Sequence, residues 1–261
     1  MKSSAADPQY GNWVPEKLLI LLWALSTFSI VVLVVNLLWF KNPILTVVFA
    51  IAGAILLVYA ILMQMLHHTF SFKGGKLMGQ IHQFVLKNLA WDGKGKLLDI
   101  GCGSGALTIR CAKAFPQGEM VGADYWGATW DYAQEQCIRN AQLEHISNIQ
   151  FVKDDAAHLS FPTETFDAAV SNFVFHEVRT VTDKRSLVLE ALRVVKKGGS
   201  FAFHDMFEVK RLYGDMDQFV QVLKDSGISQ VSYIPHTENL PFVPRSIKIL
   251  FKDTGLLYGI K

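Results

Sequence analysis

Apolar and polar positions divide the chain into two unequal parts. Two long uncharged apolar runs, 18–40 and 44–66, lie near the start of the sequence. Each matches the roughly 20 residues that a helix needs to cross the hydrocarbon core of a bilayer. Because only Lys41-Asn42-Pro43 joins them, both runs must belong to one tight antiparallel hairpin. The pattern predicts a transmembrane hairpin over 18–66, preceded by an N-terminal segment, 1–17.

Residues that flank the two runs predict how the hairpin is oriented. Aromatic rings prefer the headgroup level, and four lie near the ends of the runs: Trp13, Trp23, Trp39 and Tyr59. Basic residues precede the first run or follow the second, namely Lys2, Lys17, Lys73, Lys76 and Lys87. The hairpin tip carries only Lys41. The positive-inside rule then places both termini and the rest of the chain in the cytoplasm, as an integral membrane protein.

The apolar runs leave two alternatives to a membrane hairpin open. A cleaved signal peptide fits poorly, because the first run is too long and no small-residue cleavage site follows it. Two buried core helices would also be apolar, although uncharged runs of this length are rare in small domains.

The remaining residues, 67–261, alternate between strand-like and helix-like patterns. A polar joint with a Gly-Gly pair opens this part at 67–75. Strands are expected at 96–100, 119–124, 149–154, 166–171, 200–204, 230–234 and 256–260. Helices are expected at 77–89, 130–143, 183–195 and 215–224. A further helix is expected after strand 96–100, ending at about residue 114. Such alternation predicts an α/β fold with a Rossmann-like, doubly wound, mostly parallel seven-stranded sheet.

Composition and charge narrow the class of partner. Hydrophobic residues make up 51% of the chain and charged residues 18%, and the apolar excess lies in the two runs. The net charge of +2 gives no basic footprint for nucleic acid. The three cysteines have no C-x-x-C spacing, so we expect reduced thiols and no metal site.

A glycine turn follows the first expected strand of this part. Strand 96–100 leads directly into Gly101-Cys-Gly-Ser-Gly105, and a helix is expected immediately afterwards. Glycines are needed where a chain turns sharply or touches a ligand with its backbone. Asp124 and Asp155 end the next two strands, and a carboxylate in the first of these places typically binds ribose hydroxyls. Together these residues favour a nucleoside ligand.

Further motifs follow the glycine turn in order. They are Asp155-Ala156, the stretch 166–172 (Phe-Asp-Ala-Ala-Val-Ser-Asn) and the stretch 192–199 (Leu-Arg-Val-Val-Lys-Lys-Gly-Gly). With the turn and Asp124, these motifs resemble those of the class I S-adenosylmethionine (SAM)-dependent methyltransferases over roughly 76–261. The stretch 124–130 is also similar to a bacterial subgroup of small-molecule methyltransferases.

The resemblance implies SAM as cofactor and assigns residues to it. The implied cofactor-binding residues are Asp99, Gly101, Gly103, Gly105, Asp124, Tyr125, Trp126, Asp155, Ala156 and Asn172. Asp99 and the glycines would hold the methionine end of SAM, and Asp124 its ribose. Tyr125 and Trp126 would flank the adenine, with Asp155 and Ala156 at its edge.

Two histidines are the candidates for catalysis. His176-Glu177 follows the fourth strand and His204-Asp205 ends the fifth, on the acceptor side of this fold. Histidine titrates near neutral pH, so either could remove a proton from an alcohol, phenol or thiol. A strand-end histidine can also be a purely structural polar group.

The acceptor class follows partly by exclusion. The chain lacks the Asn/Asp-Pro-Pro-Tyr/Phe motif of DNA amino-methyltransferases and the Pro-Cys nucleophile of pyrimidine C5-methyltransferases. A small molecule remains, and the hairpin suggests a lipophilic acceptor at the membrane surface. An anchor that only localises an enzyme with a soluble substrate stays an alternative. A SAM-binding regulatory or assembly protein without catalysis, and a methyltransferase acting on a membrane protein, remain alternatives.

Overall fold

The computed structural model describes residues 7–72, 76–127 and 133–261, which form two compact units. One unit comprises 11–79, and the other joins 7–10 to 80–261. Three residues used in the predictions lie outside the described residues. They are Lys2 and Lys73, which supported the predicted membrane orientation, and Trp130, which begins the predicted helix 130–143.

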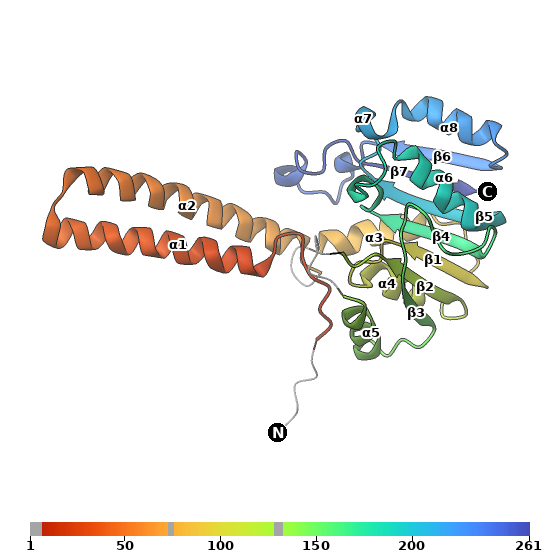
Figure 1. The fold of residues 1–261 in the computed structure, drawn as a ribbon, viewed down its shortest axis with the longest axis horizontal. Coiled ribbons are helices and arrows are strands. Elements are labelled where there is room, and N and C mark those ends of the chain that lie inside the picture. Colours follow the sequence, from red (N-terminus) through yellow and green to blue (C-terminus); the bar gives the residue numbers. More distant parts are fainter. Residues whose placement is uncertain (1–6, 73–75, 128–132) are drawn as a thin grey trace, which may run out of the picture. The chain divides into compact units, whose positions relative to one another are not determined.

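The first unit is an antiparallel pair of long helices (Figure 1). Helix α1 spans Glu16–Val35 and continues as a π-helical turn, η1, over Asn36–Phe40. Helix α2 spans Pro43–Phe70 and so runs four residues past the predicted end. Asn42 begins α2, because its side-chain oxygen accepts hydrogen bonds from two backbone N–H groups of the first turn.

Small residues line the contact between α1 and α2. Ser26, Ser29, Gly53 and Ala60 are buried, and the Ser29 hydroxyl donates to the Phe49 carbonyl at 3.2 Å. Small side chains let helix backbones approach closely, as in membrane helix pairs. The large apolar side chains point outward instead. In the most apolar 18-residue stretch, 22% of residues are buried in the helix formed by α1 and η1, and 11% in α2. Both helices are long and apolar enough to cross a membrane.

The second unit contains a seven-stranded sheet in the order β3-β2-β1-β4-β5-β7-β6. The strands are β1 Lys96–Ile100, β2 Glu119–Asp124, β3 Ile149–Lys153, β4 Phe166–Asn172, β5 Val195–Asp205, β6 Gln230–Pro235 and β7 Gly255–Ile260. Strand β7 runs antiparallel to both of its neighbours, β5 and β6, and the other strand pairs are parallel. The predicted fold class is confirmed. Strand β5 begins five residues early, because Val195 already pairs with Phe166 before a bulge.

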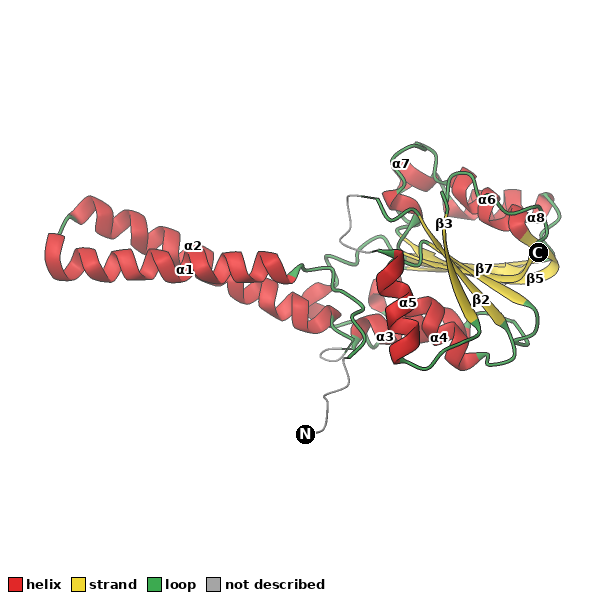
Figure 2. Ribbon diagram, turned by 60° about the horizontal axis from the view of Figure 1, so that its bottom comes forward, coloured by secondary structure: helices red, strands yellow, loops and turns green. Residues whose placement is uncertain are grey.

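Helices cover both faces of the sheet (Figure 2). Helices α3 (Leu77–Lys87), α4 (Ala106–Ala114) and α5 (Gln134–Leu143) lie on one face. Helices α6 (Arg185–Val194), α7 (Lys210–Tyr213) and α8 (Met216–Asp225) lie on the other. Neighbouring strand residues point to opposite faces, so Leu97 packs under α3 and α4 while Leu98 packs under α6 and α8.

Strand register brings the predicted site residues to one edge of the sheet. Strands β1, β2 and β4 are parallel, and Ile100 lies opposite both Ala123 and Ser171. Asn172 at the end of β4 lies opposite His204 near the end of β5. The carboxyl ends of these strands therefore meet where doubly wound sheets bind ligands.

Candidate active site

The glycine turn after β1 has the backbone that only glycine adopts easily. Gly101, Gly103 and Gly105 have φ values of +71°, +56° and +81°. A Cβ at Gly101 would lie 2.2 Å from a Val174 methyl group. The turn thus brings its backbone directly against the segment that follows β4.

Asp124 joins the glycine turn to the end of β2. Its Oδ2 accepts a hydrogen bond from the Gly103 N–H at 2.8 Å, and its Oδ1 accepts from the Trp126 N–H at 2.8 Å. The Trp126 indole in turn donates to the Gly103 carbonyl at 2.9 Å. These bonds bring three of the predicted cofactor residues together around one carboxylate.

Asp99 lies buried beneath the turn. The Thr108 hydroxyl of α4 donates to Asp99 Oδ2 at 2.6 Å. Burial raises the pKa of Asp99 to about 7, and the nearby charge of Asp124 acts in the same direction against the Thr108 hydrogen bond. A cationic group bound beside Asp99 would favour its ionised form, because a nearby positive charge stabilises a carboxylate.

Three further predicted cofactor residues, Tyr125, Asp155 and Ala156, follow the carboxyl ends of β2 and β3. Tyr125 is 61% exposed, and the Lys153 ammonium lies 5.2 Å from its ring centre. Asp155 accepts a hydrogen bond from the Ala157 N–H at 2.8 Å, and Ala156 packs against the core. Tyr125 is thus an exposed aromatic ring beside Asp124, with the Lys153 ammonium over the ring.

Residues 7–10 pack against the glycine turn, a contact that the sequence did not reveal. Asn140 of α5 exchanges hydrogen bonds with the Gln9 backbone and donates to the Ser104 carbonyl at 3.0 Å. The Ser104 hydroxyl donates to the Tyr10 carbonyl at 2.7 Å, and the Tyr10 hydroxyl donates to Glu144 at 2.8 Å. The N-terminal segment therefore belongs to the wall of this site.

His176 pairs with Asp205, a partner that the sequence pattern did not indicate. His176 lies in a 3₁₀ turn, η2 (Phe175–Glu177), and its Nδ1 is 2.7 Å from Asp205 Oδ1. Asp205 is buried at the end of β5 and also accepts hydrogen bonds from three backbone N–H groups, those of Val174, Phe175 and Met206.

The charge of Asp205 controls the pKa of His176. Burial alone would lower the pKa of His176, but the hydrogen bond and negative charge of Asp205 outweigh it and raise the pKa. The pKa of Asp205 is lowered despite burial, because His176 and the backbone N–H groups stabilise the carboxylate. His176 Nε2 stands 3.4 Å from Glu177 Oε1, beyond normal hydrogen-bond length. Nε2 is thus the nitrogen left for an acceptor.

His204 has a different environment. It is buried, its Nδ1 lies 2.9 Å from Asn172 Oδ1, and its Nε2 lies 2.8 Å from the Thr237 hydroxyl. Thr237 is hydrogen-bonded to Thr254, so the chain of contacts ties β4 and β5 to both ends of the β6–β7 connection. Burial lowers the pKa of His204 to about 4, so the ring is neutral at pH 7 with both nitrogens engaged.

Phe173 separates the two histidines. Its φ is +58°, a strained value for a bulky residue, and its ring packs edge-on against His204 (4.6 Å between centres) and more distantly against His176 (6.1 Å). The ring also meets Phe251 at 5.4 Å. An aromatic wall therefore borders the His176–Asp205 pair.

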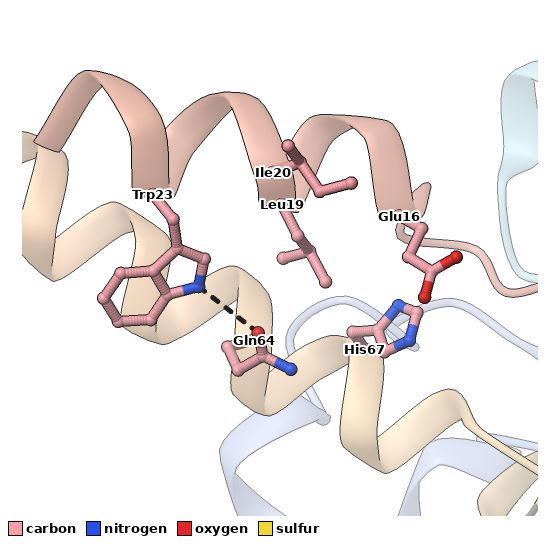
Figure 3. A pocket seen from close by; sticks show the side chains of 6 residues that line it. All are labelled: Glu16, Leu19, Ile20, Trp23, Gln64 and His67. Carbon is pink, nitrogen blue, oxygen red and sulfur yellow. Dashed lines mark hydrogen bonds between the residues drawn. The ribbon is translucent and has the colours of Figure 1, made fainter. Parts of the chain in front are cut away.

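A separate cavity of about 410 Å³ lies within the hairpin (Figure 3). Its lining residues are Glu16, Leu19, Ile20, Trp23, Gln64 and His67. The Trp23 indole donates to Gln64 Oε1 at 3.3 Å, which explains the single amide in the second apolar run. None of these residues belongs to the site at the sheet edge.

Comparison with known proteins identifies the family. Residues 98–203 match the methyltransferase domain family. A demethylmenaquinone methyltransferase of Bacillus licheniformis is 33% identical over 169 residues, which cover 61% of this chain and 69% of the relative. A ubiquinone/menaquinone biosynthesis C-methyltransferase of Pseudomonas fluorescens is 26% identical over 191 residues, 59% of this chain and 72% of the relative. With two other curated relatives, the chain spans only 37% and 42% of their length.

A solved structure with the same fold is geranyl diphosphate C-methyltransferase from Streptomyces coelicolor A3(2), in complex with Mg²⁺, geranyl diphosphate and S-adenosyl-L-homocysteine. It aligns with 71% of this chain and 80% of its own at a TM-score of 0.54 and 15% identity. The likeness extends to the fold alone, whereas the Bacillus relative is similar enough in sequence and coverage to establish kinship. This chain therefore belongs to the class I SAM-dependent methyltransferase family.

Proposed function

We propose that this protein transfers the methyl group of SAM to a small lipophilic acceptor that carries an ionisable proton, at a membrane surface. The observation that carries the proposal is the buried Asp205, which holds His176 beside the segment that touches the glycine turn. A base oriented by a buried carboxylate is what an alcohol or phenol acceptor needs, since its proton must leave as the new bond forms.

The residues around the glycine turn fit SAM. The backbone of Gly101–Gly105 leaves room for close approach, Asp124 can accept hydrogen bonds from ribose hydroxyls, and exposed Tyr125 can stack on adenine. Asp155 and Ala156 lie at the end of the adjacent strand, where they would meet the edge of the base. Asn172 hydrogen-bonds to His204 and would shape the site from the β4 side.

We assign the proton transfer to His176 and a positioning role to His204. Nε2 of His176 takes the acceptor's hydroxyl proton, and Asp205 stabilises the resulting imidazolium through Nδ1. SAM supplies an electrophilic methyl carbon: the acceptor atom bonds to it while the methyl–sulfur bond breaks and leaves its electron pair on sulfur. His204, with both nitrogens engaged, holds Asn172 and Thr237 in place.

The names of the relatives and the hairpin together favour a lipophilic acceptor. Two relatives are named as methyltransferases of quinones, which are lipid-soluble. Both helices of the hairpin carry apolar side chains outward, which costs free energy in water and is favourable in a bilayer. We therefore infer an integral membrane protein whose hairpin crosses the bilayer, with both termini and the sheet domain in the cytoplasm.

A labelled-methyl assay tests the proposal. The full chain in lipid nanodiscs receives SAM with a labelled methyl group, together with a lipid extract, a soluble-metabolite extract or a membrane-protein fraction. We expect label in the lipid extract with the unaltered chain. We expect none with the Asp124→Ala variant, which lacks the carboxylate proposed to bind the ribose of SAM. Gln150→Ala, near the amino end of β3 and away from the carboxyl ends of the strands, serves as a control that should keep activity.

Two results of this assay would contradict the proposal. Label in the protein fraction would replace the small acceptor with a protein substrate. No label in any fraction, with SAM binding intact, would favour a SAM-binding protein without catalysis.

A further inference from the structure

The β6–β7 connection carries an unusual apolar tip. Ile249 is 80% exposed, the highest value of any large apolar side chain among the described residues, and the adjacent Leu250 is 54% exposed. In the described part of 80–261 no other pair of consecutive large apolar residues is exposed in this way. Figure 1 shows this connection projecting from the sheet domain as an indigo loop between β6 and β7.

Buried contacts fix the loop and hold the tip outward. Val243, Ile247 and Phe251 recur every four residues and are buried. The Phe251 N–H donates to the Ile247 carbonyl at 3.2 Å, so this stretch makes one helix-like turn with an inner side and an outer side. The exposure of Ile249 and Leu250 thus follows from a packed turn rather than from a loose one.

The charge around the tip is positive. Arg245, Lys248 and Lys252 flank the exposed pair, against the single acid Asp253, and the Lys248 ammonium reaches Asn239 at 3.1 Å. An apolar tip with a basic collar has the chemistry of segments that enter the boundary between headgroups and acyl chains of anionic membranes.

The base of the same loop belongs to the acceptor side of the site. Strand β7 begins opposite Asp205, so the connection leaves the sheet at the edge where His176 lies. Phe251, two residues after Ile249, packs against Phe173, and Thr237 at the other end of the loop bonds to His204. One short element therefore links the exposed tip to the aromatic wall beside His176.

We infer that the turn formed by residues 245–252 inserts Ile249 and Leu250 into an anionic lipid bilayer and that the acceptor reaches His176 from the bilayer along this turn. The access route rests on the function proposed above, whereas the insertion does not depend on it. The site would thereby open toward the membrane, and a lipid-soluble acceptor would reach the base without crossing water.

Probes at two exposed apolar positions test insertion. Ile249→Cys carries an environment-sensitive fluorophore in the full chain, and Val222→Cys on α8, where the native side chain is 54% exposed, carries the same label as a control. The three native cysteines are buried and should escape labelling. In nanodiscs containing phosphatidylglycerol, we expect a blue shift and quenching by spin-labelled lipids at position 249 but not at position 222. We expect a weaker effect in phosphatidylcholine alone, because the basic collar then lacks its anionic partner.

Equal water exposure of both labels in anionic nanodiscs would overturn the inference and leave a protein partner as the occupant of the tip. The access route has its own test in the double variant Ile249→Ser/Leu250→Ser. Methyl transfer to a prenylated naphthoquinol in the bilayer should fall about tenfold, while transfer to unprenylated 1,4-dihydroxynaphthalene and SAM affinity stay unchanged. Equal loss with both acceptors would contradict the route. Absence of transfer by the unaltered chain would count against the proposed function and leave the insertion result standing.

Discussion

The two halves of the site differ in how they are built. The half formed by β1 and β2 uses glycines, backbone N–H groups and one strand-end carboxylate, all within 101–126. The half formed by β4, β5 and the β6–β7 connection uses side chains drawn from distant segments, such as His176 with Asp205 and His204 with Thr237. The first, the cofactor half, suits a constant ligand such as SAM. The second, the acceptor half, can change with the acceptor while the cofactor half stays as it is.

The largest expected effect comes from the glycine turn. Gly101→Ala places a Cβ 2.2 Å from Val174 at a positive φ, so we expect a loss of SAM affinity of about 100-fold and of stability of about 1–3 kcal/mol. Isothermal titration calorimetry and thermal unfolding measure both. Gly198→Ala is the control, because its φ is +78° but no atom lies within 4 Å of the added Cβ. Normal SAM affinity in Gly101→Ala would break the proposed role of the turn.

The next effect concerns the acceptor half. Asp205→Asn removes the charge that raises the pKa of His176, so the ascending limb of the pH–rate profile should move to lower pH, and the plateau should fall about 10- to 100-fold. The limb ascends because His176 must be deprotonated to act as a base. The pair should also make stability depend on pH in two directions. The raised pKa of His176 stabilises the fold at low pH, and this contribution is lost as pH rises through that pKa. The lowered pKa of Asp205 stabilises the fold at higher pH, and this contribution is lost as pH falls through that pKa. A limb that stays in place in Asp205→Asn would show that another group titrates.

A smaller catalytic effect is expected at His204. His204→Leu leaves Asn172 and Thr237 without their buried partner, which should lower the free energy of unfolding by about 1–3 kcal/mol. Because Asn172 and Thr237 already engage both ring nitrogens of His204, methyl transfer measured well below the melting temperature should fall only severalfold. Loss of activity as large as that of a His176 variant would contradict the positioning role.

The smallest effect concerns residues 7–10. Asn140→Ala removes three hydrogen bonds that hold Gln9 and Ser104 together, and we expect SAM affinity to weaken about three- to tenfold. Asn148→Ala is the matched control: it removes the hydrogen bonds of Asn148 to the Phe115 and Gly118 carbonyls, at the amino ends of β2 and β3. Equal SAM affinity in the two variants would show that residues 7–10 do not contribute to SAM binding.

The same contrast explains how much the sequence revealed. The pattern of apolar residues located all seven strands, and the glycine turn with Asp124 was readable because its parts are close in the sequence. The partner of His176 could not be predicted in this way, because Asp205 lies 29 residues away and is adjacent to His204 in the sequence. Parallel pairing of β4 and β5 places Asp205 next to the segment that follows β4. The register of these two strands is the signal that could have identified Asp205 as the partner of His176.

Two other features depend on tertiary contacts that no local pattern reveals. Gln9 meets Asn140 across 131 residues, and the short helix α7 and the 3₁₀ turn at His176 carry no apolar period. Helix α2 continues past the apolar run to Phe70, so that His67 and His68 lie in its last turn, and His67 Nδ1 lies 2.9 Å from the Val14 carbonyl oxygen.

The most direct test of this division is to measure SAM affinity and methyl transfer side by side in His176→Ala and Asp124→Ala. We predict that His176→Ala binds SAM within about twofold of the unaltered chain, yet transfers methyl groups about 100-fold or more slowly. Asp124→Ala should lose both. If His176→Ala retained rapid transfer, or lost SAM binding together with activity, the separation into a cofactor half and an acceptor half would be wrong.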